Sequence, residues 1–211
     1  MNKSKIQKIF SILEQYYTRN EIIELKYTNN YTLLISVLLS AQATDKGVNK
    51  ATEELFKIAD TPEKMLALGE VKLKQYLKTL NYYNTKTKHI LELSKILVEK
   101  FNSQIPTTRE ELESLPGIGR KTANVVLNIV FDKHTIAVDT HVFRVSNRIG
   151  LVKADNVLDT EMELYKIIPT NYVRFVNHWL VLLGRYICKA RKPECDKCPI
   201  KELCEKHIAN S

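Results

Sequence analysis

The chain has 211 residues, of which 44% are hydrophobic, and this is enough to bury a core in one large or two small domains. The formal net charge of +8 favours a polyanionic partner, either nucleic acid or an anionic membrane surface, and the alternative is a charge that reflects solubility or genome composition. The longest apolar stretch, residues 31–41, carries Thr and Ser and is too short to cross a membrane. The N-terminal residues lack the apolar core of a signal peptide, so we expect a cytoplasmic protein in which disulfides are unfavourable.

Helical periodicity dominates the chain. In two long segments the apolar residues recur at steps of three and four, as one face of an α-helix requires. These residues are Ile90, Leu93, Leu97 and Phe101 in the first segment, and Tyr172, Phe175, Trp179 and Leu183 in the second. Only residues 135–138 look like a strand. The sequence therefore predicts an all-α fold with many helices of about ten to fifteen residues.

The stretch LPGIGRKTANVVLN, residues 115–128, follows a predicted short helix. That short helix begins with Thr108 and Glu111, whose spacing is typical of a capping box. A second helix starts near Gly119, and its apolar face contains Ala123, Val126, Leu127 and Val130. The opposite side, which we expect to face away from the packing surface, contains Lys121, Asn124 and Asn128.

Two glycines, Gly117 and Gly119, lie in the tight turn between these helices. Glycine permits positive φ and close approach by a ligand, and the free amides of the turn and the first helical turn can hold a phosphate oxygen. The alternative is a helix–turn–helix of purely structural use. The full pattern of residues 115–123 resembles the helix–hairpin–helix motif of DNA-repair proteins, which binds the sugar–phosphate backbone without reading bases.

All four cysteines lie within 17 residues as C-x6-C-x2-C-x5-C, at Cys188, Cys195, Cys198 and Cys204. Four thiolates at this spacing can hold either a 4Fe–4S cube or a tetrahedral zinc ion, and spacing leaves both open. The same loop is rich in cations that partly offset the negative charge of such a site. Those that point outward could bind phosphates, and the alternative is a solvated loop; they are Lys189, Arg191, Lys192, Lys197 and Lys201.

The chain resembles the endonuclease III family of DNA glycosylases and abasic-site lyases from end to end. The motifs that carry the resemblance are LLSAQATD at 38–45, LPGIGRKTANVVLN at 115–128, AVDTHVFR at 137–144 and the cysteine pattern. The resemblance implies a 4Fe–4S cluster and two helical domains flanking a DNA-binding cleft. One is a six-helix domain at 23–133, with the helix–hairpin–helix at about 108–128. The other joins residues 1–22 to 134–211 and carries the cluster.

The family's catalytic residues fall on Lys121 and Asp139. Attack by an amine on the anomeric carbon expels the base and leaves a Schiff base, from which β-elimination cuts the strand. A carboxylate can stabilise the oxocarbenium-like transition state and assist proton transfer. The positive end of a helix dipole disfavours a cation, which suits a lysine that reacts as a neutral amine. From the residues alone, Asp139 has a second interpretation as a helix N-cap.

The resemblance also assigns DNA contacts, because reaching a base in a duplex requires extruding it. The residue that fills the vacated space falls on Gln42, whose alternative is an exposed loop amide. A second inserting residue, usually aliphatic after a glycine, falls on Tyr82, which follows Asn81. An aromatic ring can still stack between bases. The remaining predicted DNA contacts are Gly117, Gly119, Arg120, His141, Arg144 and Lys192, and for His141 and Arg144 a structural role is the alternative.

We therefore expect a monomeric, nucleoid-associated enzyme that acts on double-stranded DNA containing oxidised pyrimidines or abasic sites. One rival is a mismatch-type glycosylase of the same superfamily, but such enzymes generally lack a lysine at the position of Lys121. The adenine-mismatch type usually also has a C-terminal recognition domain, whereas this chain stops seven residues after Cys204. A rival of another class is a non-catalytic iron–sulfur protein that binds DNA.

Overall fold

The computed structural model describes residues 1–17, 19 and 22–206, and within this part of the chain the regular elements are all helical. This confirms the all-α fold class. Residues 135–138, which resemble a strand in sequence, run as an irregular segment between two helices. None of the helices among the described residues combines the length and the apolar character that a membrane span needs.

Contacts within the chain divide it into two compact units, residues 24–131 and residues 1–23 with 132–211. The roles that the sequence analysis assigns to its two domains stay predictions. The helices of the first unit are α2 Asn30–Leu39, α3 Asp45–Thr52, α4 Leu55–Ile58, α5 Pro62–Leu77, α6 Tyr83–Phe101, α7 Arg109–Glu113 and α8 Arg120–Phe131. Those of the second are α1 Lys3–Tyr17, α9 Thr140–Ile149, α10 Val157–Ile167 and α11 Val173–Leu182.

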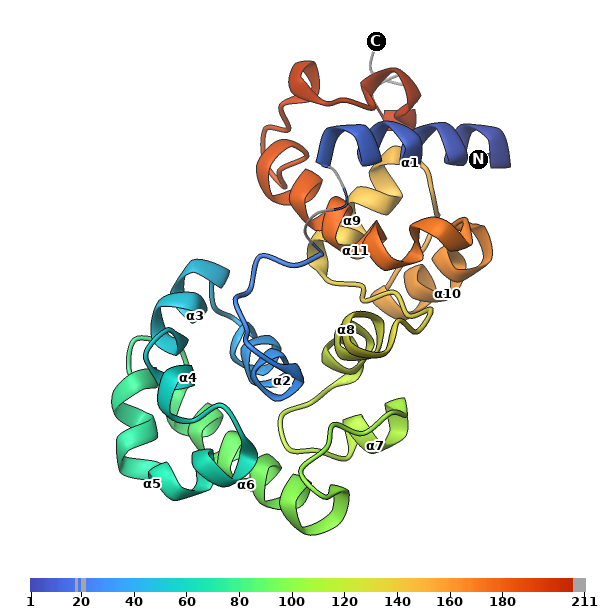
Figure 1. The fold of residues 1–211 in the computed structure, drawn as a ribbon. Helices are drawn as coiled ribbons and strands as arrows, with labels where there is room; N and C mark the ends of the chain where they lie inside the picture. Colours follow the sequence, from blue (N-terminus) through green and yellow to red (C-terminus); the bar gives the residue numbers. More distant parts are fainter. Residues whose placement is uncertain (18, 20–21, 207–211) are drawn as a thin grey trace. The chain divides into compact units, whose positions relative to one another are not determined.

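Helix α2 is the central helix of the unit 24–131. Nine of its ten residues, 31–39, are buried, and it contacts α3, α6 and α8 (Figure 1). The apolar stretch that is too short for a membrane is therefore a core helix, surrounded by other helices. Its N-terminus is fixed by a capping box between Asn29 and Thr32, in which each side chain accepts a hydrogen bond from the backbone amide of the other residue.

The predicted helix–turn–helix at 108–128 consists of α7 and α8, which pack on each other (Figure 1). Thr108 caps α7 by accepting from the Glu111 amide at 3.3 Å, and its hydroxyl donates to the Glu111 carboxylate at 2.7 Å. Asn124 and Asn128 are buried, so the prediction that this side of α8 faces away from packing is wrong for both. Helix α8 contacts α2 as well as α7, so more than its apolar face is covered.

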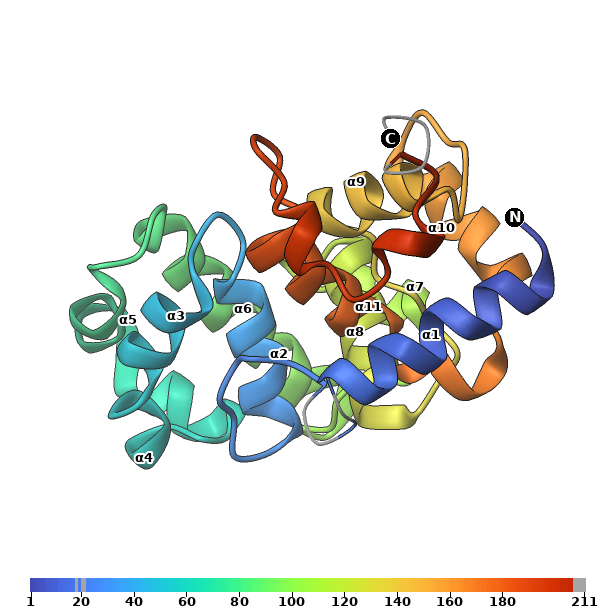
Figure 2. The ribbon, with the colours of Figure 1, turned by 90° about the horizontal axis from the view of Figure 1, so that it is seen from above.

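The second unit is built around one apolar core that combines both ends of the chain. Ile9 and Phe10 of α1 are fully buried in it together with Trp179 of α11. Stacked rings link these parts, since the ring centroids of Phe10 and Tyr172 lie 5.5 Å apart. Figure 2 shows α1 running along the C-terminal part of the chain. Burial of aromatic and aliphatic side chains therefore holds the N-terminal helix onto α11.

Candidate active site

The turn between α7 and α8 is anchored by apolar residues on both sides of its glycines. Leu115 and Ile118 are buried, and the Ile118 amide donates to the Leu115 carbonyl at 3.1 Å. Gly117 has a φ of +77°, which a residue with a Cβ adopts only with strain. Lys121 follows in the first turn of α8 and is exposed, as the sequence predicts. The fold therefore presents the Lys121 amine to solvent directly after a rigid hairpin.

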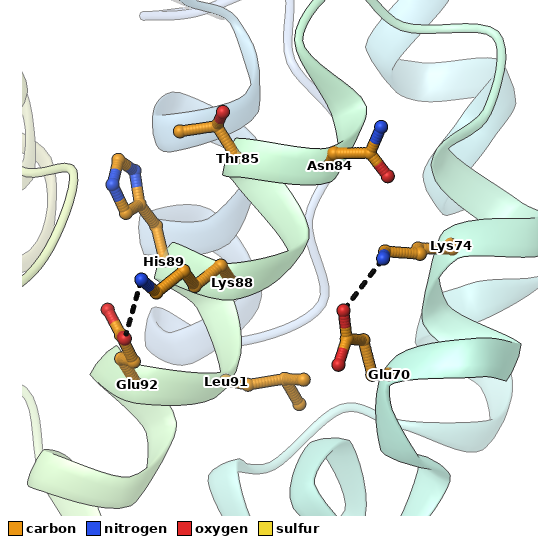
Figure 3. A pocket seen from close by; sticks show the side chains of 8 residues that line it. All are labelled: Glu70, Lys74, Asn84, Thr85, Lys88, His89, Leu91 and Glu92. Carbon is orange, nitrogen blue, oxygen red and sulfur yellow. Dashed lines mark ion pairs between the residues drawn. The ribbon is translucent and has the colours of Figure 1, made fainter.

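Helix α6 supports this hairpin through His89, a residue that the sequence analysis does not identify. A Cβ placed on Gly117 would lie 2.7 Å from Nδ1 of His89, so the imidazole packs against the backbone of the turn. The same ring lines a polar pocket between α5 and α6 (Figure 3). Its lysines are paired with carboxylates inside the pocket, with N–O distances of 2.7 Å for Lys74–Glu70 and 3.8 Å for Lys88–Glu92. This pocket therefore offers no concentrated positive charge to a phosphate.

Gln42 and Tyr82, the two predicted inserting residues, lie on loops that are hydrogen-bonded to each other. The Asn81 side-chain amide donates to the Gln42 carbonyl at 3.0 Å. Both Gln42, with φ +52°, and Tyr82, with φ +57°, adopt left-handed backbone conformations that are uncommon for residues with a side chain. Tyr82 is 65% exposed, which is unusual for so large an aromatic residue. The structure thus places these two exposed residues on neighbouring loops of the unit 24–131.

Asp139 is the N-cap of α9, as its alternative interpretation predicts. Its Oδ1 accepts from the backbone amides of His141 and Val142, both at 2.8 Å, and the residue is half-buried. The cap fixes the orientation of the carboxyl group while Asp139 stays accessible. Capping and catalysis are compatible for this reason. Asp139 and Lys121 belong to different units of the chain.

Arg144 and His141 are largely engaged within their own unit. The Arg144 guanidinium donates to the Gly184 carbonyl at 2.8 Å and to the Cys188 carbonyl at 3.3 Å. It also lies 3.2 Å from Nδ1 of His141. Arg144 therefore links α9 to the π-helical segment Leu183–Ile187 and to the first cysteine, which supports its structural role. Its contact with DNA stays a prediction, as does that of His141.

The four cysteines line one pocket, whose walls also include Ile149, Leu183, Ile187 and Pro193. Burial raises the pKa of the Cys198 thiol to about 11, and the three other cysteines add to the rise. A zinc ion would need its sulfurs about 3.8 Å apart, given Zn–S bonds of about 2.3 Å, whereas each thiolate of a cube binds a different iron.

This donor set fits a 4Fe–4S cluster. Four soft sulfur ligands surround one apolar pocket, and Arg148 donates towards the Cys188 sulfur at 3.7 Å. The same guanidinium donates to the carbonyls of Lys189 at 2.6 Å and Ala190 at 2.9 Å, which holds the beginning of the loop. The Arg148 cation offsets the negative charge of a thiolate-ligated cluster, and hydrogen bonds to ligating sulfur adjust its potential.

The basic residues of the cysteine loop differ in their pairing. Lys189 and Lys197 both donate to the Glu194 carboxylate, and these two hydrogen bonds lower the pKa of Glu194 to about 2. Within the described part of the chain, Arg191 and Lys192 are exposed and make no ion pair. Lys192 has a φ of +50°. Of the five cations in the loop, Arg191 and Lys192 are therefore the ones most available to a phosphate.

Comparison with known proteins identifies the class of protein to which this fold and this site belong. Residues 35–170 match the family model described as the HhH-GPD superfamily base excision DNA repair protein, and residues 188–204 match the iron–sulfur binding domain of endonuclease III. Endonuclease III of Rickettsia conorii (strain ATCC VR-613 / Malish 7) is 53% identical over 205 residues, which cover 97% of each chain. Endonuclease III of Escherichia coli (strain K12) is 48% identical over the same share of each.

A solved structure gives the same result. The structure of a trapped endonuclease III–DNA covalent intermediate, an estranged-adenine complex, matches with a TM-score of 0.90 and 39% identity and covers 100% of this chain and 99% of that one. The chain belongs to the endonuclease III family. It is accordingly a base-excision repair enzyme, with DNA glycosylase and abasic-site lyase activity, and its cofactor is a 4Fe–4S cluster.

Proposed function

We propose that this protein binds duplex DNA containing oxidised pyrimidines or abasic sites, with Lys121 as the nucleophile and Asp139 as the carboxylate that assists base release. The observation that carries the proposal is the exposed Lys121 amine, fixed in the first helical turn after a phosphate-binding type of hairpin. The solved relative trapped as a covalent DNA intermediate supports it, because a lysine amine is a group that can form such a bond.

The reaction begins when the neutral Lys121 Nζ attacks C1′ of the extruded nucleotide. The N-glycosidic bond breaks, and its electron pair leaves with the base, which takes up a proton. Asp139 stabilises the positive charge that develops on the sugar and accepts a proton from the attacking amine. The C1′–O4′ bond then breaks with its electron pair on O4′, which takes up a proton, while the lone pair of Nζ completes a protonated Schiff base with C1′.

Strand cleavage follows from the Schiff base. The iminium withdraws electrons from C2′, so a 2′ hydrogen is lost as a proton and its electron pair forms the C2′–C3′ double bond. The C3′–O bond breaks, and the 3′ phosphate leaves with the electron pair of that bond. Water then hydrolyses the imine, which returns Lys121 to its amine form and releases the unsaturated aldehyde at the 3′ end.

The DNA contacts divide into backbone binding and base insertion. We assign backbone binding to the amides around Gly117 and Gly119 and to the half-buried Arg120. Insertion into the stack is assigned to Gln42 and Tyr82, both of which are exposed. His141, Arg144 and Lys192 are assigned as further contacts of the second unit. Binding to chromosomal DNA would place the protein at the nucleoid.

Borohydride trapping tests the proposal. Incubation with duplex DNA containing thymine glycol or an abasic site, followed by reduction, should give a covalent adduct that peptide mapping places on Lys121. Lys121→Gln should lose the adduct and nearly all strand cleavage while it keeps the cluster absorption. Lys95→Gln is the matched control, because Lys95 is another exposed lysine of the same unit. A Lys121→Gln protein that traps and cleaves normally would show that the nucleophile lies elsewhere.

A further inference from the structure

A buried lysine lies beneath the loop that carries Gln42, and neither the chemistry nor the hairpin uses it. Lys86 of α6 is only 5% exposed. Lysine is almost never buried unless its charge is compensated. Its ammonium donates to two backbone carbonyls, Leu39 at 2.9 Å and Ala41 at 2.8 Å. Burial lowers the pKa of Lys86, because removal of the ammonium from water disfavours its charged form. The two hydrogen bonds offset part of this desolvation cost.

The two carbonyls lie at the end of a helix and just beyond it. Helix α2 ends at Leu39, and the last carbonyls of a helix lack partners within it. A cation at this end is favoured both by the helix dipole and by those free acceptors. With Lys86 holding the carbonyls of Leu39 and Ala41, the chain turns sharply into the left-handed conformation of Gln42. The buried ammonium therefore fixes the backbone directly before the exposed Gln42.

A second bond joins this loop to the one that carries Tyr82. The Asn81 amide donates to the Gln42 carbonyl at 3.0 Å, so the carbonyls of both Ala41 and Gln42 accept from residues near the start of α6. Tyr82 occupies the N-cap position of α6 with φ +57°. A bulky residue in this region is strained and persists only when its surroundings fix it.

We propose that Asn81 and Lys86 are positioning residues that join the loops 39–42 and 81–83 into one preformed insertion edge, from which Gln42 and Tyr82 enter the DNA stack together. This inference rests on the proposed function. An edge fixed before binding does not have to be ordered on binding, which strengthens affinity without adding a contact to DNA. Two side chains on one rigid edge also fill the space of the extruded base at a fixed separation.

The experiment measures insertion separately from chemistry. Cluster-loaded, full-length protein is titrated with a duplex that contains a tetrahydrofuran abasic analogue, which cannot form a Schiff base because it has no aldehyde carbon. A 2-aminopurine base beside the analogue reports unstacking by its fluorescence, and an undamaged duplex of the same sequence reports binding without insertion. The variants are Asn81→Ala, Tyr82→Ala and the double substitution, with Asn84→Ala as the control because Asn84 is exposed on α6 and lines the pocket of Figure 3.

Asn81→Ala should weaken binding to the analogue by about three- to tenfold, as expected for one lost hydrogen bond, and should reduce the fluorescence rise. Binding to undamaged duplex and thermal stability should stay close to those of Asn84→Ala. Tyr82→Ala should have a larger effect of the same kind. The double variant should lose less than the sum of the two single losses, because the part of the Asn81 effect that acts through Tyr82 disappears with the ring. A contact that was merely structural would instead give additive effects.

Variants of Lys86 provide a second test in the same binding experiment. Lys86→Met removes the donors and should weaken analogue binding more than Asn81→Ala, and Lys86→Gln, which retains an amide donor, should recover part of the loss. If Lys86→Met does not fold, the comparison between Lys86→Gln and Asn81→Ala replaces it. If Asn81→Ala binds the analogue like the unsubstituted protein while Tyr82→Ala binds it more weakly, the positioning role is wrong and the insertion role stands. An unchanged Tyr82→Ala protein would overturn the insertion role as well, and neither result depends on whether Lys121 is the nucleophile.

Discussion

The hairpin of the unit 24–131 and the cysteine loop of the other unit differ in what holds them. Leu115 and Ile118 anchor the hairpin in the core, and His89 packs against its turn. Among residues 188–204, by contrast, only Ile200 is buried, and the regular structure consists of two short 3₁₀ turns. A segment that buries so little apolar surface cannot offset its conformational entropy by packing. The hairpin is therefore shaped by the fold, whereas the cysteine loop depends on its ligand.

Breaking the cluster should give the largest structural effect. Cys198→Ser removes one ligand, so purified protein should lose the broad absorption near about 400 nm and most of its roughly four irons per chain. Because ligation contributes to folding, the loop should open and trypsin should cleave within 188–204 on the order of 100-fold faster, equivalent to about 2.7 kcal/mol. Asp196→Asn, an exposed change in the same loop, serves as the control. Colourless protein with one zinc would contradict the cluster assignment.

Asp139 contrasts with the cysteine loop, because it lies in the same unit but is positioned by α9, which it caps. Asparagine can still accept from the His141 and Val142 amides, so Asp139→Asn should keep the fold and the iron content. Loss of the charge should slow base release by about 10²–10⁴-fold, while cleavage of preformed abasic sites decreases much less. Single-turnover assays on thymine-glycol and abasic duplexes measure the two steps separately.

Asn156 provides the matched control for the Asp139 cap. It accepts from the Asp159 amide at 2.9 Å and caps α10 in the same unit. Both Asp139→Ala and Asn156→Ala should lower the free energy of unfolding by about 0.5–2 kcal/mol. Only Asp139→Ala should affect base release. Equal activity of the two alanine variants would leave Asp139 with a structural role alone.

Sequence predicts the parts of this site whose cause is local. Gly117 is required by its own backbone conformation, and the four cysteines share one short segment. The N-cap role of Asp139 likewise follows from the residues beside it. The contacts of Lys86 and Asn81 span 39 to 47 residues along the chain, and no pattern in either segment indicates them. Asn124 and Asn128 show the same limit, because helical periodicity identifies one apolar face but not whether the opposite face is also covered.

The rigidity of the hairpin can be tested at its two glycines. Gly117→Ala forces a positive φ on a residue with a Cβ and places that atom 2.7 Å from the His89 ring, so it should lower the free energy of unfolding by about 1–3 kcal/mol. Gly119→Ala meets no atom within 4 Å and should be nearly neutral in the absence of DNA. Chemical denaturation measures both. Equal stability of the two variants would mean that the turn is looser than its packing indicates.

The smallest effect should come from the exposed cations of the cysteine loop. Lys192 makes no ion pair within the described part of the chain, so its charge is available to a DNA phosphate. Lys192→Ala should reduce the slope of log affinity against log salt by about 0.9 for undamaged duplex, because one fewer counterion is released on binding. Lys166→Ala is the control: Lys166 lies in the same unit, but its ammonium is held 2.7 Å from Glu163. If both variants keep the original slope, Lys192 faces solvent, and the loop serves the cluster without binding DNA at this position.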